Sequence, residues 1–155
     1  MNKIQKYSIG AALALFYYLA YSGNLSHIIA YHEQHHLFLF TEAYFEQQVQ
    51  SEGFFSYLTD FIIQFFYYPA LGSALLALLL ASVYLMSSNI IRFLFGKEDL
   101  LHLSVIPSLA LFYHTMEASH TMVPITISVL TLAIINLMLW IFHSYMPLIP
   151  FFKNV

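Results

Sequence analysis

Cysteine is absent from this sequence of 155 residues, and charged residues are scarce. Without cysteine the chain can form no disulfide, no thiolate nucleophile and no cysteine-ligated metal centre. Charged residues make up only 8% of the sequence, whereas they make up about a quarter of a typical soluble domain. The five Lys and Arg residues form no basic cluster that could bind nucleic acid. These absences exclude disulfide scaffolds, thiol enzymes and nucleic-acid-binding proteins.

Hydrophobic residues, in contrast, make up 60% of the chain, and its mean hydropathy is +0.71. This composition predicts an all-α polytopic membrane protein whose main partner is the lipid bilayer, with one membrane domain over residues 1–155. A transmembrane helix needs about 20 mostly apolar residues. By this measure we expect about four spans, at residues 4–22, 70–91, 100–116 and 122–142.

The region between the first two spans, residues 24–68, contains acidic residues but no Lys or Arg. Thr41 in this loop is typical of an N-cap and predicts a short helix after it. In the aromatic stretch that follows, Ser56, Asp60 and Gln64 recur every four residues and so share one helical face. We expect an amphipathic helix that lies in the membrane interface or packs against other helices, and in the interface the polar stripe would face water. A ligand-binding role for the stripe is the alternative.

The basic residues all fall on one side of the four-span arrangement: Lys3, Lys6, Arg92, Lys97 and Lys153. The positive-inside rule assigns that side to the cytoplasm. Both termini are therefore expected to be cytoplasmic. Most acidic residues and histidines then lie on the extracytoplasmic side, where we expect any functional site.

The densest group of chemically active residues is His32-Glu33-Gln34-His35-His36. It matches the His-Glu-x-x-His pattern, in which two histidines one helical turn apart bind zinc and the glutamate activates water. No second motif supplies a third ligand, and short matches of this kind also arise by chance.

A second metal hypothesis pairs Glu33-x-x-His36 with Glu117-x-x-His120. Di-iron carboxylate bundles use such pairs on facing helices, together with bridging glutamates. A divalent metal ion held by His32, His36, Glu117 and His120 is thus the cofactor that the sequence allows. The alternative is that these residues solvate a loop or cap helix ends.

Glu33 has a further possible role, because it lies a few residues beyond the first span. An acid there can act as a base or hold a divalent cation against a lipid-linked phosphate. We take Glu33, Gln34 and Asp60 as the candidate catalytic residues. A plain surface position for Glu33 is the alternative.

A series of short motifs in the first half of the chain occurs in a characteristic order. The motifs are His32 to Gln34, Leu37 to Thr41, Tyr44-Phe45, Tyr57, Phe61 to Tyr67, Pro69 and Gly72. They resemble a family of multi-pass inner-membrane proteins of unknown function from Bacteroidetes-type bacteria, over about residues 5–95. Members of that family are several times longer, so the resemblance implies an amino-terminal portion or a shortened member.

The chain departs from that family in two places. Ser51-Glu52-Gly53 stands where the family tends to have Pro-Gly-Gly, and His36 completes a zinc pattern that the family usually lacks. The second departure suggests that the zinc match is incidental and that Glu33 and Gln34 are the positions of interest.

The layout of a first span, an outward loop with an acid and further spans is also similar to the start of membrane glycosyltransferases that use polyprenyl-phosphate sugars. That likeness implies part of a cell-envelope enzyme with Glu33 as its catalytic acid. A non-catalytic membrane subunit, which binds other subunits or the remainder of a longer chain, is the alternative hypothesis. A metal-binding membrane protein is the third.

Overall fold

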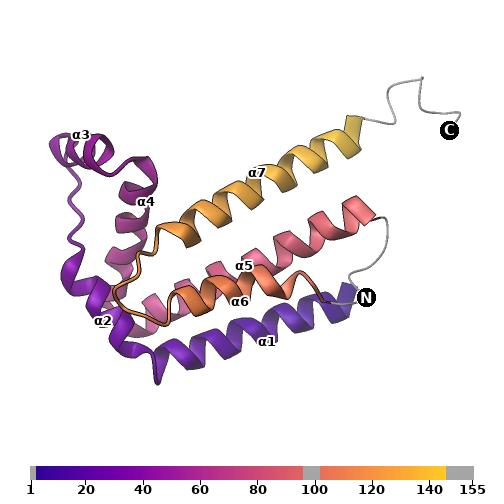
Figure 1. Ribbon diagram of the computed structural model, residues 1–155, viewed down its shortest axis with the longest axis horizontal. Helices are drawn as coiled ribbons and strands as arrows, with labels where there is room; N and C mark the ends of the chain where they lie inside the picture. The colour runs from indigo at the N-terminus through magenta and orange to yellow at the C-terminus, as the bar shows by residue number, and fades with distance from the viewer. Residues whose placement is uncertain (1–2, 96–101, 146–155) are drawn as a thin grey trace, which may run out of the picture.

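The computed structural model describes residues 3–95 and 102–145, which form seven α-helices and one short 3-10 helix (Figure 1). The helices in chain order are α1 Lys3–Ser22, α2 Ser26–His35, α3 Glu42–Ser51, α4 Phe54–Ile63, η1 Gln64–Tyr67, α5 Pro69–Phe95, α6 Val105–His114 and α7 Val123–Tyr145. No strand occurs in these two described ranges. The all-α prediction is confirmed.

Four of these helices form what we call the bundle, namely α1, α5, α6 and α7. Each of them runs antiparallel to the bundle helix that precedes it in the chain (Figure 1). The central helix is α5, which contacts α1, α6 and α7. The other three, α2, α3 and α4, lie together at one end of the bundle and form what we call the cap (Figure 1). The predicted loop, residues 24–68, is therefore mostly helical.

Two of the four predicted spans are supported by the length and composition of their helices. Among the described residues only α5 and α7 are long and apolar enough to cross a membrane. Helix α6 has ten residues, which reach about 15 Å of the roughly 30 Å hydrocarbon core. Helix α1 has twenty residues, but Lys3, Gln5 and Lys6 occupy its first turns and tyrosines its last turns.

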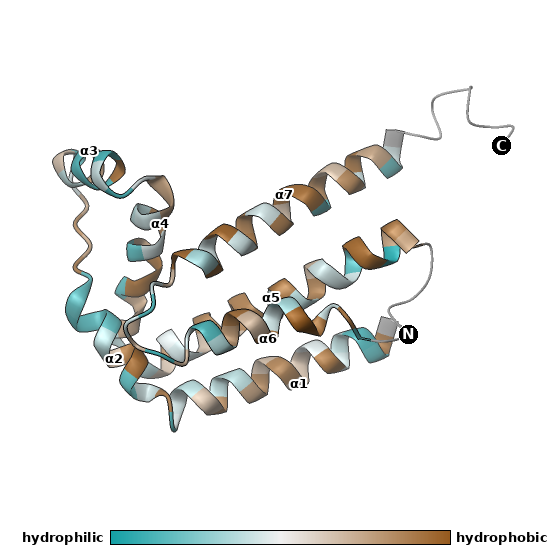
Figure 2. Cartoon of the chain, in the orientation of Figure 1, coloured by the Kyte–Doolittle hydropathy of each residue, from teal (hydrophilic) through white to brown (hydrophobic). Residues whose placement is uncertain are grey.

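The two apolar helices differ in their surroundings. In the most apolar stretch of α5, 44% of the residues are buried inside the protein, against 11% in α7. Figure 2 shows that both helices are largely hydrophobic along their length. Large apolar side chains therefore cover the outer surface of α7, and examples are Ile134, Leu137, Met138, Trp140 and Phe142.

Hydroxyl groups join the bundle helices across their apolar contacts. The Tyr17 and Ser108 hydroxyls are 2.8 Å apart, and Ser108 Oγ donates to the Leu80 carbonyl at 2.7 Å. Tyr21 makes a similar contact with Thr115. These bonds link α1, α5 and α6 at fully buried positions, where an unpaired hydroxyl would be costly.

Two residues shape the start of α5. Pro69 is the first residue of α5, where its missing N–H costs nothing. Gly72 is buried and permits a close approach, because a Cβ atom there would lie 2.6 Å from Phe66 Cδ1. The neighbour is η1, which reverses the chain between α4 and α5.

The polar stripe of α4 faces the protein interior, whereas we expected it to face water. Ser56 is 8% exposed, Thr59 3% and Asp60 5%, whereas the outward Phe54 is 52% exposed. The stripe is therefore not the wet side of the helix, because it packs against α3, α7 and the end of α2. In the cap, α4 turns Phe54 and Phe55 outward and its polar side chains inward.

Candidate functional site

The buried Asp60 carboxylate is the centre of a polar network in the cap. Its Oδ1 lies 3.3 Å from His36 Nδ1. Its Oδ2 accepts hydrogen bonds from the Tyr44 hydroxyl at 3.1 Å and from Gln48 Nε2 at 2.9 Å. Three segments of the chain thus meet at one acid. We call His36, Tyr44, Gln48, Glu52, Ser56 and Asp60 the Asp60 cluster.

A second carboxylate extends this network towards the surface. Glu52 Oε2 accepts from Ser56 Oγ at 2.7 Å and from Gln48 Nε2 at 3.0 Å. Gln48 therefore donates to both acids and lies between them. Glu52 is exposed and Asp60 is buried, so the Asp60 cluster runs from the surface into the protein.

Local sequence signals place these residues. The Thr41 hydroxyl accepts from the Tyr44 N–H at 3.2 Å, which confirms the predicted N-cap and starts α3. Tyr44 and Gln48 are then four residues apart on one face of α3, as are Ser56 and Asp60 on α4. Gly53 joins the two helices with a φ of 92°, a left-handed conformation that favours glycine.

His36 lies at the end of α2 and is oriented by Asp60. The hydrogen bond with Asp60 and the carboxylate charge raise the pKa of His36 above its ordinary value of 6.5. A carboxylate on Nδ1 fixes the ring and its tautomer, as in catalytic triads. The side chain is 37% exposed, so part of the ring is accessible from outside. The pair has the arrangement of an acid–base group.

His32, one turn earlier on α2, has the opposite environment. It is 1% exposed, and neither ring nitrogen has a hydrogen-bond partner within the described parts of the chain. Burial lowers its pKa to about 4, and the neighbouring His36 and His35 act in the same direction. Its ring stacks on that of His36 with centroids 5.3 Å apart. His32 is therefore neutral at neutral pH.

Tyr44 acts as a hydrogen-bond donor to Asp60 and not as a base. Burial raises the pKa of Tyr44 to about 12, and the carboxylate of Asp60 adds to this effect. The hydroxyl therefore stays protonated at neutral pH. Together with Gln48 it fixes the orientation of the Asp60 carboxylate.

The structure brings only one of the three candidate catalytic residues into this network. Asp60 is its centre, whereas Gln34 is exposed and Glu33 is half-buried on α2. Within the described residues, the Glu33 carboxylate takes part in no hydrogen bond or ion pair. Glu33 and Gln34 remain predictions without a structural partner.

The four candidate metal ligands form two separate pairs. His32 and His36 stack on each other at the end of α2. In the other pair, His120 Nε2 lies 3.4 Å from Glu117 Oε2, in the turn between α6 and α7. The two Glu-x-x-His segments thus do not project from facing helices. In the part of the chain that the structure describes, no group of three or more metal-binding side chains is assembled.

Sequence reasoning missed the partners of Asp60. From the sequence, we did not link Tyr44, Gln48 or His36 to Asp60. Tyr44 and Gln48 are nevertheless four residues apart in the helix that begins after the Thr41 N-cap, so they share one of its faces. That spacing was the available signal. The convergence of α3 and α4 on the end of α2 depends on the turn at Gly53, which no pattern specified.

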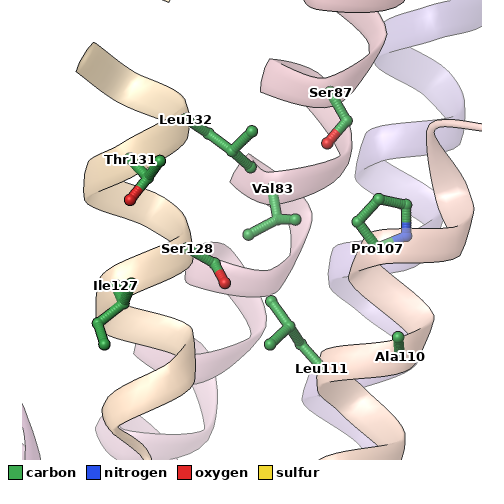
Figure 3. A pocket seen from close by; sticks show the side chains of 9 residues that line it. All are labelled: Val83, Ser87, Pro107, Ala110, Leu111, Ile127, Ser128, Thr131 and Leu132. Atoms are coloured by element: carbon green, nitrogen blue, oxygen red, sulfur yellow. The ribbon is translucent and has the colours of Figure 1, made fainter. Parts of the chain in front are cut away.

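An apolar cavity lies elsewhere, between α5, α6 and α7 (Figure 3). Its volume is about 470 Å³, and its wall includes Val83, Pro107 and Leu132 together with the hydroxyls of Ser87 and Ser128. No titratable side chain lines it, so it offers no acid–base chemistry. The Asp60 cluster remains the candidate functional site.

Comparison with protein families identifies a match over residues 2–153, nearly the whole chain, to the family of unknown function DUF6057. The chain belongs to this family. The match includes α6 and α7, which lie beyond the residues 5–95 of the resemblance described above. Neither the curated proteins nor the solved structures gave a match to this chain.

Proposed function

We propose that this member of DUF6057 is an integral membrane protein with an acid–base site at the membrane surface, in which Asp60 orients His36. The observation that carries the proposal is the contact of 3.3 Å between His36 Nδ1 and the buried Asp60 carboxylate, with His36 still partly exposed. Such a histidine can take a proton from a hydroxyl group and return it to a leaving group. No other titratable pair among the described residues combines a buried carboxylate with an accessible histidine.

The membrane placement is supported by three features. Helices α5 and α7 are long and apolar enough to span. The outer surface of α7 carries large apolar side chains, which lipid solvates and water does not. Helix α4 buries its polar side chains and exposes Phe54 and Phe55, as expected for a helix whose surroundings are apolar.

The polarity of the molecule supports the orientation that we predicted. Lys6 and Arg92 lie at the end of the bundle opposite the cap, where Lys6 Nζ donates to Asn89 Oδ1 (Figure 1). The acidic residues of the cap lie at the other end. The positive-inside rule then places the cap on the extracytoplasmic side of a bacterial inner membrane. Lys97 and Lys153 lie outside the described residues.

A substrate at this surface can come from the membrane itself. A lipid-linked sugar phosphate would bring a hydroxyl acceptor or a leaving group to the level of the cap, where His36 can exchange a proton with it. This keeps the glycosyltransferase-like hypothesis, with His36 and Asp60 in place of Glu33 as the reacting groups.

The test is to purify the chain in detergent and to measure retained polyprenyl-phosphate lipids by mass spectrometry, together with sugar transfer from a polyprenyl-phosphate sugar. His36→Gln keeps a polar side chain but cannot exchange protons, so we expect transfer to fall at least 100-fold, the lower range for loss of a general acid–base group. Glu33→Gln is the matched variant on the same helix. Full transfer by His36→Gln, with loss in Glu33→Gln, would return the catalytic role to Glu33.

A non-catalytic membrane subunit is the second candidate, and the exposed surface of α7 favours it. Only 11% of the apolar stretch of α7 is buried, so a partner helix could cover it. Under this hypothesis His36→Gln leaves function intact, whereas a bulky Ile134→Trp or a charged Leu137→Lys change on the exposed side of α7 disrupts a complex. Native mass spectrometry of the two α7 variants separates this candidate from the first.

A further inference from the structure

We infer that His32 and His36 form a two-histidine site for a divalent transition-metal ion, which would bind at the outer nitrogen of His36. The inference goes beyond the proposed function and concerns the same histidine. It depends on metal binding alone, so it can hold even if the chain is not an enzyme.

The first observation is the state of His36. Asp60 lies on Nδ1 at 3.3 Å, so in the neutral ring Nδ1 carries the proton and the Nε2 lone pair points away from the carboxylate. Metal-binding histidines typically donate their other ring N–H to a carboxylate, which fixes the ring and makes it a better ligand. Asp60 is placed to play this part for His36.

The second observation is independent and concerns His32. This imidazole is 1% exposed and both of its nitrogens lack a hydrogen-bond partner within residues 3–95 and 102–145. A buried polar group without a partner is rare in proteins and calls for an explanation. The backbone of His120 lies close enough to affect the ring, but it does not satisfy either nitrogen. A metal ion would supply the missing partner.

The two rings are close enough to share one ion. The His36 N–H donates to the His32 carbonyl at 3.0 Å, so the helical turn between them is closed. The rings are nearly parallel, at an interplanar angle of 27° with centroids 5.3 Å apart. Zinc binds imidazole nitrogen at about 2.0–2.1 Å and prefers a tetrahedral arrangement. With the His36 ring held by Asp60, rotation of the His32 side chain would bring one of its nitrogens to an ion on His36 Nε2, and water would fill the other positions.

The chemistry of these donors defines the kind of metal. Neutral imidazoles favour Cu²⁺, Ni²⁺ and Zn²⁺ over Mg²⁺ and Ca²⁺, which prefer carboxylate and carbonyl oxygens. His35 lies between these two histidines in the sequence but makes other contacts. Its Nδ1 lies 2.7 Å from the Tyr31 carbonyl oxygen, and its ring stacks on Tyr31. We therefore expect His32 and His36, and not His35, to bind the ion.

The experiment is calorimetric titration of the full chain in detergent, stripped of metal, with Zn²⁺, Cu²⁺ and Mg²⁺ in turn. We expect one equivalent of Zn²⁺ and tighter binding of Cu²⁺, with no binding of Mg²⁺ in the same range. His36→Gln and His32→Leu should each weaken Zn²⁺ binding at least ten-fold. His35→Gln and His27→Gln should leave it unchanged.

Three results would overturn the inference: no stoichiometric Zn²⁺ binding by the wild-type chain, equal binding of Mg²⁺, or binding that survives both His36→Gln and His32→Leu. Because His32 is buried, thermal unfolding of each variant is recorded. If His32→Leu does not fold, His36→Gln and His35→Gln decide the question. Sugar transfer is measured separately, so its absence does not affect this result.

Discussion

The cap and the bundle are held together in different ways. In the cap, one buried acid collects side chains from α2 and α3, and the bonds form a continuous network. In the bundle, separate hydroxyl contacts such as Tyr17 with Ser108 join helices whose other contacts are apolar. The stability of the cap therefore depends on protonation and on several hydrogen-bond partners at once. The bundle contacts contribute to stability independently of one another.

Replacing Asp60 should cause the largest loss of unfolding free energy, and this loss should be confined to the cap. Asp60→Asn removes the negative charge that His36, Tyr44 and Gln48 contact, and a hydrogen bond to a charged group contributes about 1.5–3 kcal/mol. We expect native-state hydrogen exchange to show this loss in α3 and α4. The matched change in the bundle, Ser108→Ala, should leave the amides of the cap unaffected. A loss under about 1 kcal/mol in the cap would mean that Asp60 is not its main support.

The pH dependence of stability should come from two histidines one turn apart, measured with a chelator present. The folded-state pKa of His32 is about 4, against 6.5 in the unfolded chain, so stability falls as pH drops from about 6.5 to about 4. The difference corresponds to on the order of 3 kcal/mol. His32→Leu should remove this acid-side loss, and His27→Gln should not.

His36 contributes in the opposite direction. Its folded-state pKa is raised, so the stability it gives is fully present below 6.5 and is lost as pH rises through the folded-state value. Urea unfolding across this range should therefore show a decline on the alkaline side that is absent in His36→Gln. An alkaline decline that persists in this variant would have another origin.

A change at the junction of the two regions should have an intermediate effect. A Cβ atom at Gly72 would lie 2.6 Å from Phe66 Cδ1 and 3.0 Å from the Phe66 Cα atom. Because backbone must shift, Gly72→Ala should cost about 1–3 kcal/mol of unfolding free energy. Gly10→Ala is the control, since its nearest contact, at 3.1 Å, is the flexible side chain of Leu85. Equal effects at both glycines would refute the close contact with η1.

Removing a single hydroxyl group should cause the smallest loss of unfolding free energy, and the loss should be similar in the cap and in the bundle. Thr41→Ala removes the N-cap of α3 and should cost about 1 kcal/mol. Tyr17→Phe removes one hydrogen bond in the bundle and should also cost about 1 kcal/mol, because Ser108 still donates to the Leu80 carbonyl. Thermal unfolding of the two variants compares them. A much larger loss in Tyr17→Phe would show that the bundle hydroxyls also act as a network.

The sequence predicted the long helices and the start of α3, but not α2, which lies in the predicted loop. Long apolar runs predicted α5 and α7, and Thr41 marked the start of α3, because the chemistry of a helix end depends on adjacent residues. The all-α class followed for the same reason. The number of helices long enough to span a membrane did not follow from the sequence. The described part of the 100–116 segment, for example, is helical only over Val105–His114.

Only the tertiary structure decided which side of α4 faces inward and which residues meet Asp60. A four-residue spacing shows that Ser56 and Asp60 share a face, but the same spacing fits a face turned to water or to the protein interior. The turn at Gly53 folds α3 onto α4 and turns this polar face inward. The opposite environments of His32 and His36 arise in the same way, because burial and the distance to a carboxylate depend on segments far apart in the sequence.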